Sequence, residues 1–572
     1  MLASSKRYRS SILVILAGLT CAFALTAVAK GGGGGLWLSG GQDKHNNRNA
    51  SKESKISAEN AGDLGIKWTF TTTGDVTANP AVDGKNVYFP DWGGKLYSID
   101  RESGAENWSK DISDYTFLPA AFGGVSRATP AVHGDSLIFG DQGGRGFAGA
   151  HMISVDKHSG VMNWVTKIED HAAALVTTSP IVHGNTVYVG VASNDEAWAA
   201  FIPGYPCCFA RGSVVALDAN TGEVQWKTYM VPDASSGFSG NSVWGSTPVV
   251  DTKRRSLYVT TGNNFTAPQG ILDCVATAPD ETAVKACVDV VPGNYFDSIV
   301  SLDLDTGAVK WATKALPFDA WTVACIFPIS DFGTDPENPD GDGGNLHNCP
   351  KPAGPDYDFG QSPALFTVYT DNGKKSKKSK KSKKSKKSKK SKKSKKSKKS
   401  KKSKKSKGKR RELLGAGQKS GQYWALNPDD GSVVWVTQVG AGGVLGGLQW
   451  GSATDGERIY TAVTTEGWKA LDPATGEILW HTPLPNDNFA LTFGAVTVAN
   501  GVVYAGSMSL AGENNMFALD AASGDVLFSM DSGGPVGAGA SVVKGTVYWG
   551  SGYTVLGDPA NFNNVLHALE VK

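Results

Sequence analysis

The feature that most constrains the fold is a segment of about thirteen residues that returns along the chain. In each copy, alternating apolar residues lead into an Asp or Asn, a Gly-containing turn and an aromatic residue. Alternation is typical of a strand, and Asp-x-x-(Thr/Ser)-Gly is typical of a turn in which the acid caps and Gly supplies a positive φ. Each copy therefore predicts a hairpin whose outgoing aromatic packs on a neighbour. Seven copies end at Trp108, Trp164, Trp226, Trp311, Trp435, Trp480 and Phe528, and VLHALEVK at the chain end makes an eighth.

A second hairpin signal, such as TSPIVHGNTVYVG, lies upstream of most copies. Two hairpins make a four-stranded antiparallel blade, and a radial series of blades makes a β-propeller. We therefore expect an all-β, eight-bladed propeller over residues 30–572, with seven blades as the alternative. The last copy stops after one strand-like segment. LWLSGG, near Leu36, is expected to complete that blade, so that N- and C-terminal strands close the ring.

Long intervals between some copies contain cysteines and a Lys/Ser-rich tract, and are interpreted as loop insertions. Residues 374–411 hold 24 Lys and 2 Arg, and without them 31 basic residues face 54 acidic ones, a net charge of −23. The chain is thus an acidic globule with one cationic tract, which excludes a general nucleic-acid-binding surface. The tract is expected to be a disordered insertion at a hairpin tip. It could contact polyanions, or be a slipped repeat without a role.

The N-terminus has the pattern of a secretory signal. Basic residues precede an apolar run that ends in Ala27-Val28-Ala29, which predicts a signal peptide over residues 1–29 and a secreted or periplasmic protein; the alternative is an uncleaved anchor. No later apolar run is long enough to span a membrane. Six cysteines remain, an even number that suggests disulfides in an exported chain. Cys274–Cys287, Cys325–Cys349 and the adjacent Cys207–Cys208 are plausible pairs.

With these motifs in place, the chain resembles the quinoprotein alcohol dehydrogenases, eight-bladed propellers that hold pyrroloquinoline quinone (PQQ) and a divalent metal. It looks most similar to their polyvinyl-alcohol-dehydrogenase branch, over roughly residues 36–372 and 412–572. PQQ is a flat quinone with three carboxylates, so it requires cationic partners, an aromatic surface and a Lewis acid. The resemblance implies five cofactor-binding residues: Arg127 in SRATPAV, Thr177 in VTTSPIV, Ser193 in ASNDE, Trp244 in NSVWGSTP, as the stacking ring, and Lys419 in GAGQKSGQ.

The metal site follows from the same resemblance. Glu196 in SNDEAW and Asn263 in TTGNNF match the protein ligands of Ca²⁺, a hard cation that prefers oxygen donors. Asp358 in DYDFGQSP resembles the catalytic acid that takes the hydroxyl proton and can also approach the metal. Asp356 is its rival. The family usually carries this Asp after a Trp, whereas Tyr357 precedes it here.

Each of these residues also has a structural interpretation, as a surface ion pair, a blade-packing aromatic or a turn former. The Cys207–Cys208 pair follows Glu196, not the position it takes in many relatives, and its role is open. Asn264-Phe265-Thr266 is a glycosylation sequon next to a proposed metal ligand, so either it is unused or the pocket is not catalytic.

The resemblance implies an exported enzyme that oxidises alcohol groups, secondary or polymeric ones among them. No Cys-x-x-Cys-His occurs, so electrons would pass to an external acceptor such as a cytochrome c. The alternative is a non-catalytic extracellular propeller that binds protein or polysaccharide.

Overall fold

The computed structural model describes residues 35–118, 124–143, 147–326, 346–370, 409–485, 491–554 and 562–572. Residues 35–572 form one compact unit. The predicted signal peptide, residues 1–29, and nearly all of the Lys/Ser tract lie outside the described residues. The processing of the first and the polyanion contact of the second therefore stay predictions.

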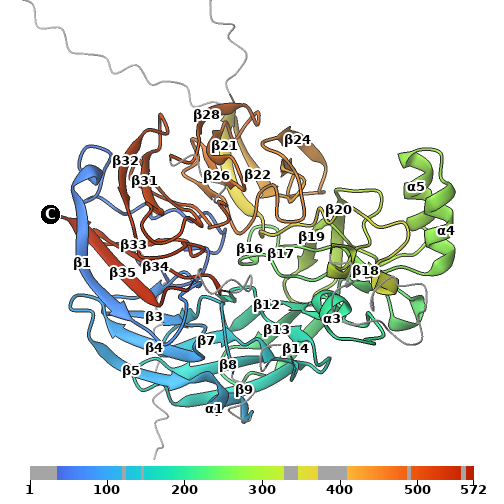
Figure 1. Ribbon diagram of the computed structural model, residues 1–572, viewed down its shortest axis with the longest axis horizontal. Coiled ribbons are helices and arrows are strands. Elements are labelled where there is room, and N and C mark those ends of the chain that lie inside the picture. Colours follow the sequence, from blue (N-terminus) through green and yellow to red (C-terminus); the bar gives the residue numbers. More distant parts are fainter. Residues whose placement is uncertain are drawn as a thin grey trace, which may run out of the picture. The chain divides into compact units, whose positions relative to one another are not determined.

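The fold is an eight-bladed β-propeller of four-stranded antiparallel sheets, as the repeat predicts (Figure 1). The first blade contains β2 (Ala81–Val82), β3 (Asn86–Pro90), β4 (Lys95–Asp100) and β5 (Glu106–Asp111), and the second contains β6 (Ala131–His133), β7 (Ser136–Gly140), β8 (Ala150–Asp156) and β9 (Met162–Glu169). The third contains β11 (Ile181–His183), β12 (Thr186–Ser193), β13 (Ser213–Asp218) and β14 (Val224–Tyr229), with β10 (Ala174–Leu175) also paired to β12. The fourth contains β16 (Val249–Asp251), β17 (Ser256–Thr260), β19 (Ser298–Asp303) and β20 (Val309–Lys314).

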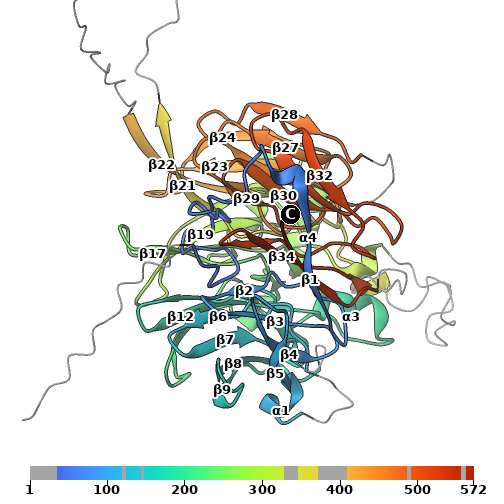
Figure 2. The ribbon, with the colours of Figure 1, turned by 90° about the vertical axis from the view of Figure 1, so that its left-hand side faces the viewer.

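The fifth blade contains β21 (Ala364–Thr370), β22 (Lys409–Gly417), β23 (Gln422–Leu426) and β24 (Val433–Gln438), and the sixth contains β25 (Ala453–Thr454), β26 (Ile459–Val463), β27 (Gly467–Leu471) and β28 (Ile478–Thr482). The seventh contains β29 (Thr497–Ala499), β30 (Val502–Gly506), β31 (Met516–Asp520) and β32 (Val526–Met530). The eighth contains β33 (Ser541–Val543), β34 (Thr546–Gly550), β35 (Val565–Val571) and β1 (Leu64–Thr71). The strands β21 and β22 pair as a hairpin on either side of the tract, as expected, and project from the ring in Figure 2.

Ring closure is made by strands from both ends of the sequence, but the N-terminal strand is not the expected one. β1 pairs antiparallel with β35, from Leu64 opposite Val571 to Thr71 opposite Val565. The expectation that LWLSGG completes this blade is wrong: Trp37 makes only one bridge, to Val82 of β2. The segment LWLSGG is apolar and short, which suits a strand, but its backbone partners belong to other blades.

Residues 36–50 instead form an inner segment that runs past the innermost strands of the blades. Its backbone exchanges hydrogen bonds with residues at or beside the innermost strands of six blades, in chain order around the ring. The innermost strands β2 and β33, β6 and β11, β11 and β16, β16 and β21, and β25 and β29 lie in contact with one another. The contacts of the inner segment are Trp37 with Val82, Leu38 with Val132, Lys44 with Val250, His45 with Leu365, Asn47 with Thr454, and Arg48 with Val498.

Adjacent blades are joined by a repeated contact between a Trp and a turn Gly. In the turn of β4, the Asp100 carboxylate accepts bonds from the amides of Glu102 and Ser103, and Gly104 has a φ of 73°. Equivalent glycines lie under the Trp of the preceding blade, so closely that an added Cβ would come within 2.8 Å of each ring. The predicted packing of the repeat aromatics is thereby confirmed. The pairs are Trp68 with Gly104, Trp108 with Gly160, Trp164 with Gly222, Trp226 with Gly307, Trp311 with Gly431, Trp435 with Gly476, and Trp480 with Gly524.

Two helical insertions lie on the connections, and the one with α4 and α5 falls in a long repeat interval, as expected. α3 (Asp195–Phe201) follows β12, while α4 (Gln269–Thr277) and α5 (Glu281–Val288) lie on the outside of the ring, joined by Cys274–Cys287 (Figure 1). The short helices α1 (Ile112–Thr116), η1 (Ala61–Asp63), η3 (Ala234–Ser236), η4 (Val323–Cys325) and η5 (Leu346–Asn348), and the two-stranded β15 (Ser239–Gly240)–β18 (Asn264–Thr266), complete the elements. Cys325–Cys349 and Cys207–Cys208 are also bonded, so all three expected pairs form.

Within the part of the chain that is described, no helix has the length and apolar character to cross a membrane.

The Trp–Gly contact predicts a large effect of one methyl group. In Gly307→Ala, the new Cβ would lie 2.4 Å from the Trp226 ring at a backbone φ of 69°. We expect it to lower the free energy of unfolding by about 3 kcal/mol, part from the left-handed backbone and part from overpacking. Gly184→Ala is the matched control, because its φ is 62° and nothing lies within 4 Å of its Cβ position. It should cost about 1 kcal/mol. Equal losses in chemical denaturation would contradict the packing role.

His567 predicts acid sensitivity of the closing blade. It lies on β35 with only 5% of its surface exposed, and burial lowers its pKa to about 4. The unfolded chain, with an ordinary pKa near 6.5, therefore binds a proton that the fold rejects between about pH 6.5 and pH 4. Stability should fall by up to about 3 kcal/mol as the pH drops through this window. In His567→Gln this part of the slope should disappear; the same pH dependence of unfolding in both proteins would sink the idea.

Candidate active site

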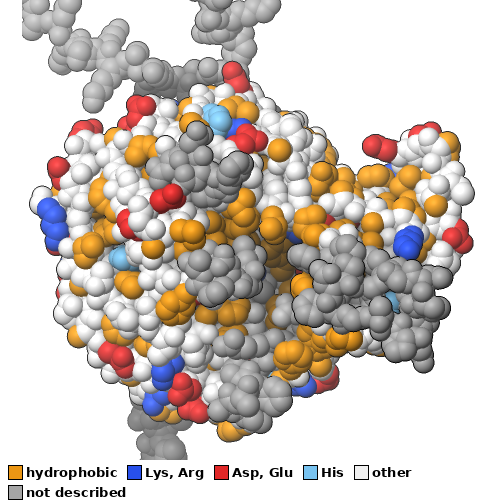
Figure 3. Space-filling model, in the orientation of Figure 1, with side chains coloured by type: hydrophobic (Ala, Val, Ile, Leu, Met, Phe, Trp, Pro, Cys, Tyr) orange, Lys and Arg blue, Asp and Glu red, His pale blue; other side chains and the backbone are white. Residues whose placement is uncertain are grey.

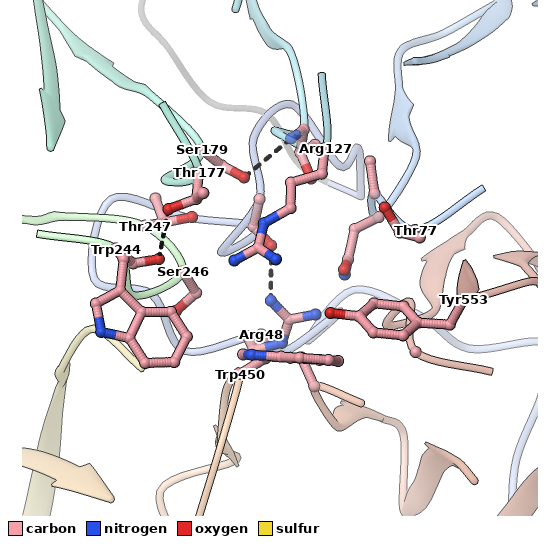
Figure 4. A pocket seen from close by; sticks show the side chains of 16 residues that line it. Arg48, Thr77, Arg127, Thr177, Ser179, Trp244, Ser246, Thr247, Trp450 and Tyr553 are labelled. Atoms are coloured by element: carbon pink, nitrogen blue, oxygen red, sulfur yellow. Dashed lines mark hydrogen bonds between the residues drawn. The ribbon is translucent and has the colours of Figure 1, made fainter. Parts of the chain in front are cut away.

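A pocket lies where the inner segment meets the residues that lead into the innermost strands. Figure 4 shows its lining, and the space-filling face in Figure 3 is hollowed near its centre with hydrophobic side chains around the hollow. Seven blades contribute, because each inner strand enters the ring from the same end. The lining residues are Gly40, Arg48, Thr77, Ala78, Asn79, Arg127, Thr129, Thr177, Ser179, Trp244, Ser246, Thr247, Trp450, Ala495, Gly537 and Tyr553.

Three of the expected cofactor residues lie in this pocket: Arg127, Thr177 and Trp244. They precede β6, β11 and β16, one residue from each of three consecutive blades. The Thr177 hydroxyl donates to the Trp244 carbonyl at 3.0 Å, which ties two of these segments together. The guanidinium group of Arg127 points into the pocket (Figure 4), and no carboxylate of the described residues forms an ion pair with it. The pocket thus offers a cation and an indole ring.

The other thirteen lining residues were not predicted from the sequence, and Arg48, Trp450 and Tyr553 are the large side chains among them. Trp450 and Tyr553 form an aromatic pair with centroids 5.1 Å apart, and Trp450 also packs on Phe493 at 5.1 Å. Arg48 lies in the polar run HNNRNAS, which has no strand or helix period. No signal in that run distinguishes it from an ordinary loop arginine.

Trp244 connects the pocket to a second group of expected residues. Its indole N–H donates to Asp358 Oδ2 at 2.6 Å, and the Lys419 ammonium lies 5.3 Å from its ring centroid. Lys419 Nζ lies 2.8 Å from Asp358 Oδ1 and 3.0 Å from Asp356 Oδ1. The structure therefore brings Trp244, Asp358 and Lys419 together, and it places the rival Asp356 in the same ion-pair group.

The charges of this group control one another. Burial lowers the pKa of Lys419, but the carboxylates of Asp356, Asp358 and Glu196 outweigh burial and raise it. Burial, with repulsion from Asp358 and Glu196, raises the pKa of Asp356 well above its ordinary value in spite of Lys419. Lys419 is thus the cation of this group, and the pKa of Asp356 is raised toward the protonated form.

Asp319 positions the loop that carries the two acids. Its carboxylate accepts bonds from the amides of Asp356 at 3.2 Å and Tyr357 at 2.8 Å. A Cβ at Gly354 would lie 2.0 Å from Asp319 Oδ1, so the loop passes this acid as closely as a glycine allows. Burial raises the pKa of Asp319 to about 6, and burial with the charge of Asp319 raises that of Asp297. Asp319 therefore supports the loop, and no pattern in the sequence indicates this role.

Glu196 lies in the first turn of α3, half-buried, beside Asp195. Asp195 anchors the following loop, because its Oδ2 accepts the amides of Phe209 and Ala210 at 2.6 Å each. Burial raises the pKa of Glu196 to about 7; Lys419 opposes this rise, while Asp358 and Asp195 add to it. Glu196 therefore belongs electrostatically to the Lys419 group.

Asn263 is buried, and both of its amide hydrogens are used, at 2.8 Å each, by the carbonyls of Asn264 and Trp321. This orientation leaves Oδ1 as an oxygen donor, as a hard cation requires. The carboxylate of Asp358 packs on Gly262, the residue before Asn263, so closely that a Cβ there would lie 2.9 Å from Oδ2. Among the described residues, however, no three His, Cys, Asp or Glu side chains are grouped closely enough to hold a metal.

The sequon next to Asn263 is closed by the fold. Asn264 is 1% exposed, and its amide nitrogen donates to Asn241 Oδ1 at 2.6 Å and Asn294 Oδ1 at 3.0 Å. A glycan on this nitrogen is incompatible with the folded chain.

Ser193 and the Cys207–Cys208 pair lie outside the pocket lining. Ser193 ends β12, and its hydroxyl accepts the Asp195 amide at 3.4 Å. Cys207 and Cys208 pack with Ala199, Phe265 and Ala324, which places the pair over α3.

Comparisons with known proteins show the family and the fold of the chain. The family model PQQ_2, described as outer membrane protein assembly factor BamB, matches residues 25–313 and 416–569. The chain belongs to this family. It is also similar to a polyvinylalcohol dehydrogenase of Sphingopyxis sp. (strain 113P3), 27% identical over 93% of this chain and 75% of that enzyme. A polyvinylalcohol dehydrogenase of Pseudomonas sp. is 26% identical over 87% and 70%. These relatives confirm the resemblance to quinoprotein alcohol dehydrogenases that the motifs predict.

Solved structures show the same fold. A quinohemoprotein alcohol dehydrogenase from Pseudomonas putida superposes with a TM-score of 0.64 at 16% identity, over 94% of this chain and 80% of that one. The quinohemoprotein alcohol dehydrogenase of Comamonas testosteroni gives 0.63 at 18% identity, over 94% and 80%.

The ion-pair group predicts that Lys419 stabilises the fold in a pH-dependent way. Lys419→Met would leave buried carboxylates without their cation, at an expected cost of about 3 kcal/mol at pH 7.5. The loss should shrink at pH 5, because the uncompensated acids then take up protons. Lys95→Met is the control, since the Lys95–Asp111 pair is exposed and should contribute less than about 1 kcal/mol. A loss that does not change with pH in urea denaturation would contradict this role.

Proposed function

We propose that the protein is an exported quinoprotein that oxidises alcohol groups, with PQQ in the pocket and Ca²⁺ at the adjoining oxygen donors. The observation that carries this proposal is the link through Trp244. Trp244 lines a pocket with two guanidinium groups that form no ion pair with a described carboxylate. Its indole N–H donates to Asp358, the acid that the family resemblance assigns to proton abstraction.

The pocket residues suit PQQ, and the types of oxygen donor beside the pocket suit Ca²⁺. Arg127 offers a charge for a carboxylate, Thr177 a hydroxyl, and Trp244 a ring for stacking. Lys419 adjoins that ring and would reach the quinone oxygens. Glu196, Asn263 and Asp358 supply the oxygen donors that Ca²⁺ prefers. When bound, PQQ would supply a two-electron acceptor and Ca²⁺ a Lewis acid.

The protein's own residues account for the acid–base part of the reaction. Asp358 accepts the hydroxyl proton, because Trp244 holds its Oδ2 and Lys419 lies against its Oδ1, so that the carboxylate is fixed in orientation. Asp319 holds the backbone of the acid-bearing loop, so the position of Asp358 does not depend on substrate. Lys419 balances the carboxylate charge and keeps the group from repelling itself.

The names of the relatives bear on the substrate, whereas the acceptor and the location are inferred from the sequence. Those named polyvinylalcohol dehydrogenase support secondary or polymeric alcohols as substrates. An external acceptor such as a cytochrome c completes the electron path. Secretion or a periplasmic location accords with the predicted signal peptide. The family description as an assembly factor supports the alternative, a propeller that binds partners without catalysis.

Titration of the purified protein with PQQ, with and without Ca²⁺, tests the proposal. We expect saturable one-to-one binding by absorbance, and Ca²⁺-dependent dye reduction with a panel of primary, secondary and polymeric alcohols. Asp358→Asn should bind PQQ but lose about 10²–10⁴-fold in kcat, and Glu196→Ala should lose the Ca²⁺ dependence. Glu223→Ala, on an exposed turn, should behave as wild type. Absence of binding at micromolar PQQ would instead support the non-catalytic alternative.

A further inference from the structure

We propose that Arg48 and Asn79 form a second anion-anchoring point of the pocket, so that a ligand with two separate carboxylates is held between Arg48 and Arg127. Where that ligand is PQQ, the inference rests on the proposed function. It assigns a binding role to the inner segment, residues 36–50, which otherwise only contacts blades.

Arg48 is a buried cation without a counter-ion. Its side chain is among those fully enclosed, and no described carboxylate lies within 4 Å of it. Two edges of its guanidinium are used: Nε donates to the Val496 carbonyl at 2.9 Å and Nη1 to the Gly40 carbonyl at 3.0 Å. Nη2 is buried and has no hydrogen-bond partner. The bonds of Nε and Nη1 fix the plane of the guanidinium group, and they direct Nη2 toward the pocket (Figure 4).

A second unsatisfied donor lies beside it. The Asn79 amide oxygen accepts the Gly539 amide at 3.0 Å, whereas its Nδ2 is buried without a partner. A Cβ at Gly539 would lie 2.3 Å from Arg48 Nη2 and 2.7 Å from Asn79 Nδ2, so both donors converge on the same side of this residue. Two converging N–H donors, one charged, are the arrangement that binds a carboxylate.

The pocket has no anion of its own to satisfy them. No Asp or Glu occurs among its lining residues, although two arginines do. Figure 4 shows the guanidinium groups of Arg48 and Arg127 facing one another, with Trp450 and Tyr553 beside them. Burial removes the Arg48 guanidinium from water and lowers its pKa to about 9. Two like charges in an enclosed site repel one another, and each also loses its hydration on burial. A ligand with two negative groups offsets both the repulsion and the loss of hydration.

A charge placed inside the protein provides the test. Asn79→Asp keeps the oxygen that accepts the Gly539 amide and puts a carboxylate next to Arg48 Nη2. The variant should be as stable as wild type or more stable without ligand, and should bind PQQ at least about tenfold more weakly. Asn220→Asp, an exposed change of the same charge, is the control and should bind as wild type. Arg48→Met should weaken binding in the same direction and reduce its salt dependence.

The outcomes separate this inference from the proposed function. If Asn79→Asp and Arg48→Met are folded by circular dichroism and bind PQQ as tightly as wild type, the second anchoring point is overturned while the quinoprotein proposal stands. If wild type does not bind PQQ, benzene-1,3,5-tricarboxylate replaces it as probe. A rise in its melting temperature that Asn79→Asp abolishes would support the anion site without PQQ. No rise with either compound would overturn it.

Discussion

The contact of a Trp with the turn glycine of the next blade is the interaction on which the rest of the structure depends. It recurs at seven interfaces, and at five of them the indole N–H also donates to a carbonyl of the same turn: Trp68 to Arg101, Trp108 to Lys157, Trp164 to Ala219, Trp226 to Leu304, and Trp480 to Ala521. Phe528 replaces Trp at the eighth, where the chain has no such turn and η1 lies against β32. Because each contact sets the spacing of two blades, together they bring the inner strands into one ring.

This ring separates two kinds of charge. The pocket holds two guanidinium groups and no carboxylate, whereas the adjoining group holds one ammonium among three carboxylates. Trp244 lies between them, with its ring in the first and its N–H in the second. In a low-dielectric interior such a division persists only if the backbone fixes each group, as Asp319 fixes the loop of Asp356 and Asp358.

Much of the fold could be predicted because the repeat encodes local rules. Alternation, the Asp cap and the turn Gly determine each hairpin, and Trp226 or Trp480 can be recognised without any tertiary knowledge. The closing strand could not, because Leu64–Thr71 and the apolar Leu36–Leu38 are both short and strand-like, and only long-range backbone pairing distinguishes them. The proposed catalytic residues Asp358 and Lys419 were predicted from motifs that resemble those of a known family. Arg48 and Asp319 were missed, since their roles depend on partners hundreds or tens of residues away that no local pattern reveals.

The arrangement of the pocket also determines which parts of the fold a bound ligand stabilises. Seven blades and the inner segment each contribute residues to it, so none of these seven blades can move outward without removing part of the pocket lining. A bound ligand therefore stabilises all the blades that line the pocket together, because its binding free energy is lost when any of them moves away. Amide protons in blades far from the site would gain protection from exchange together with those that line it.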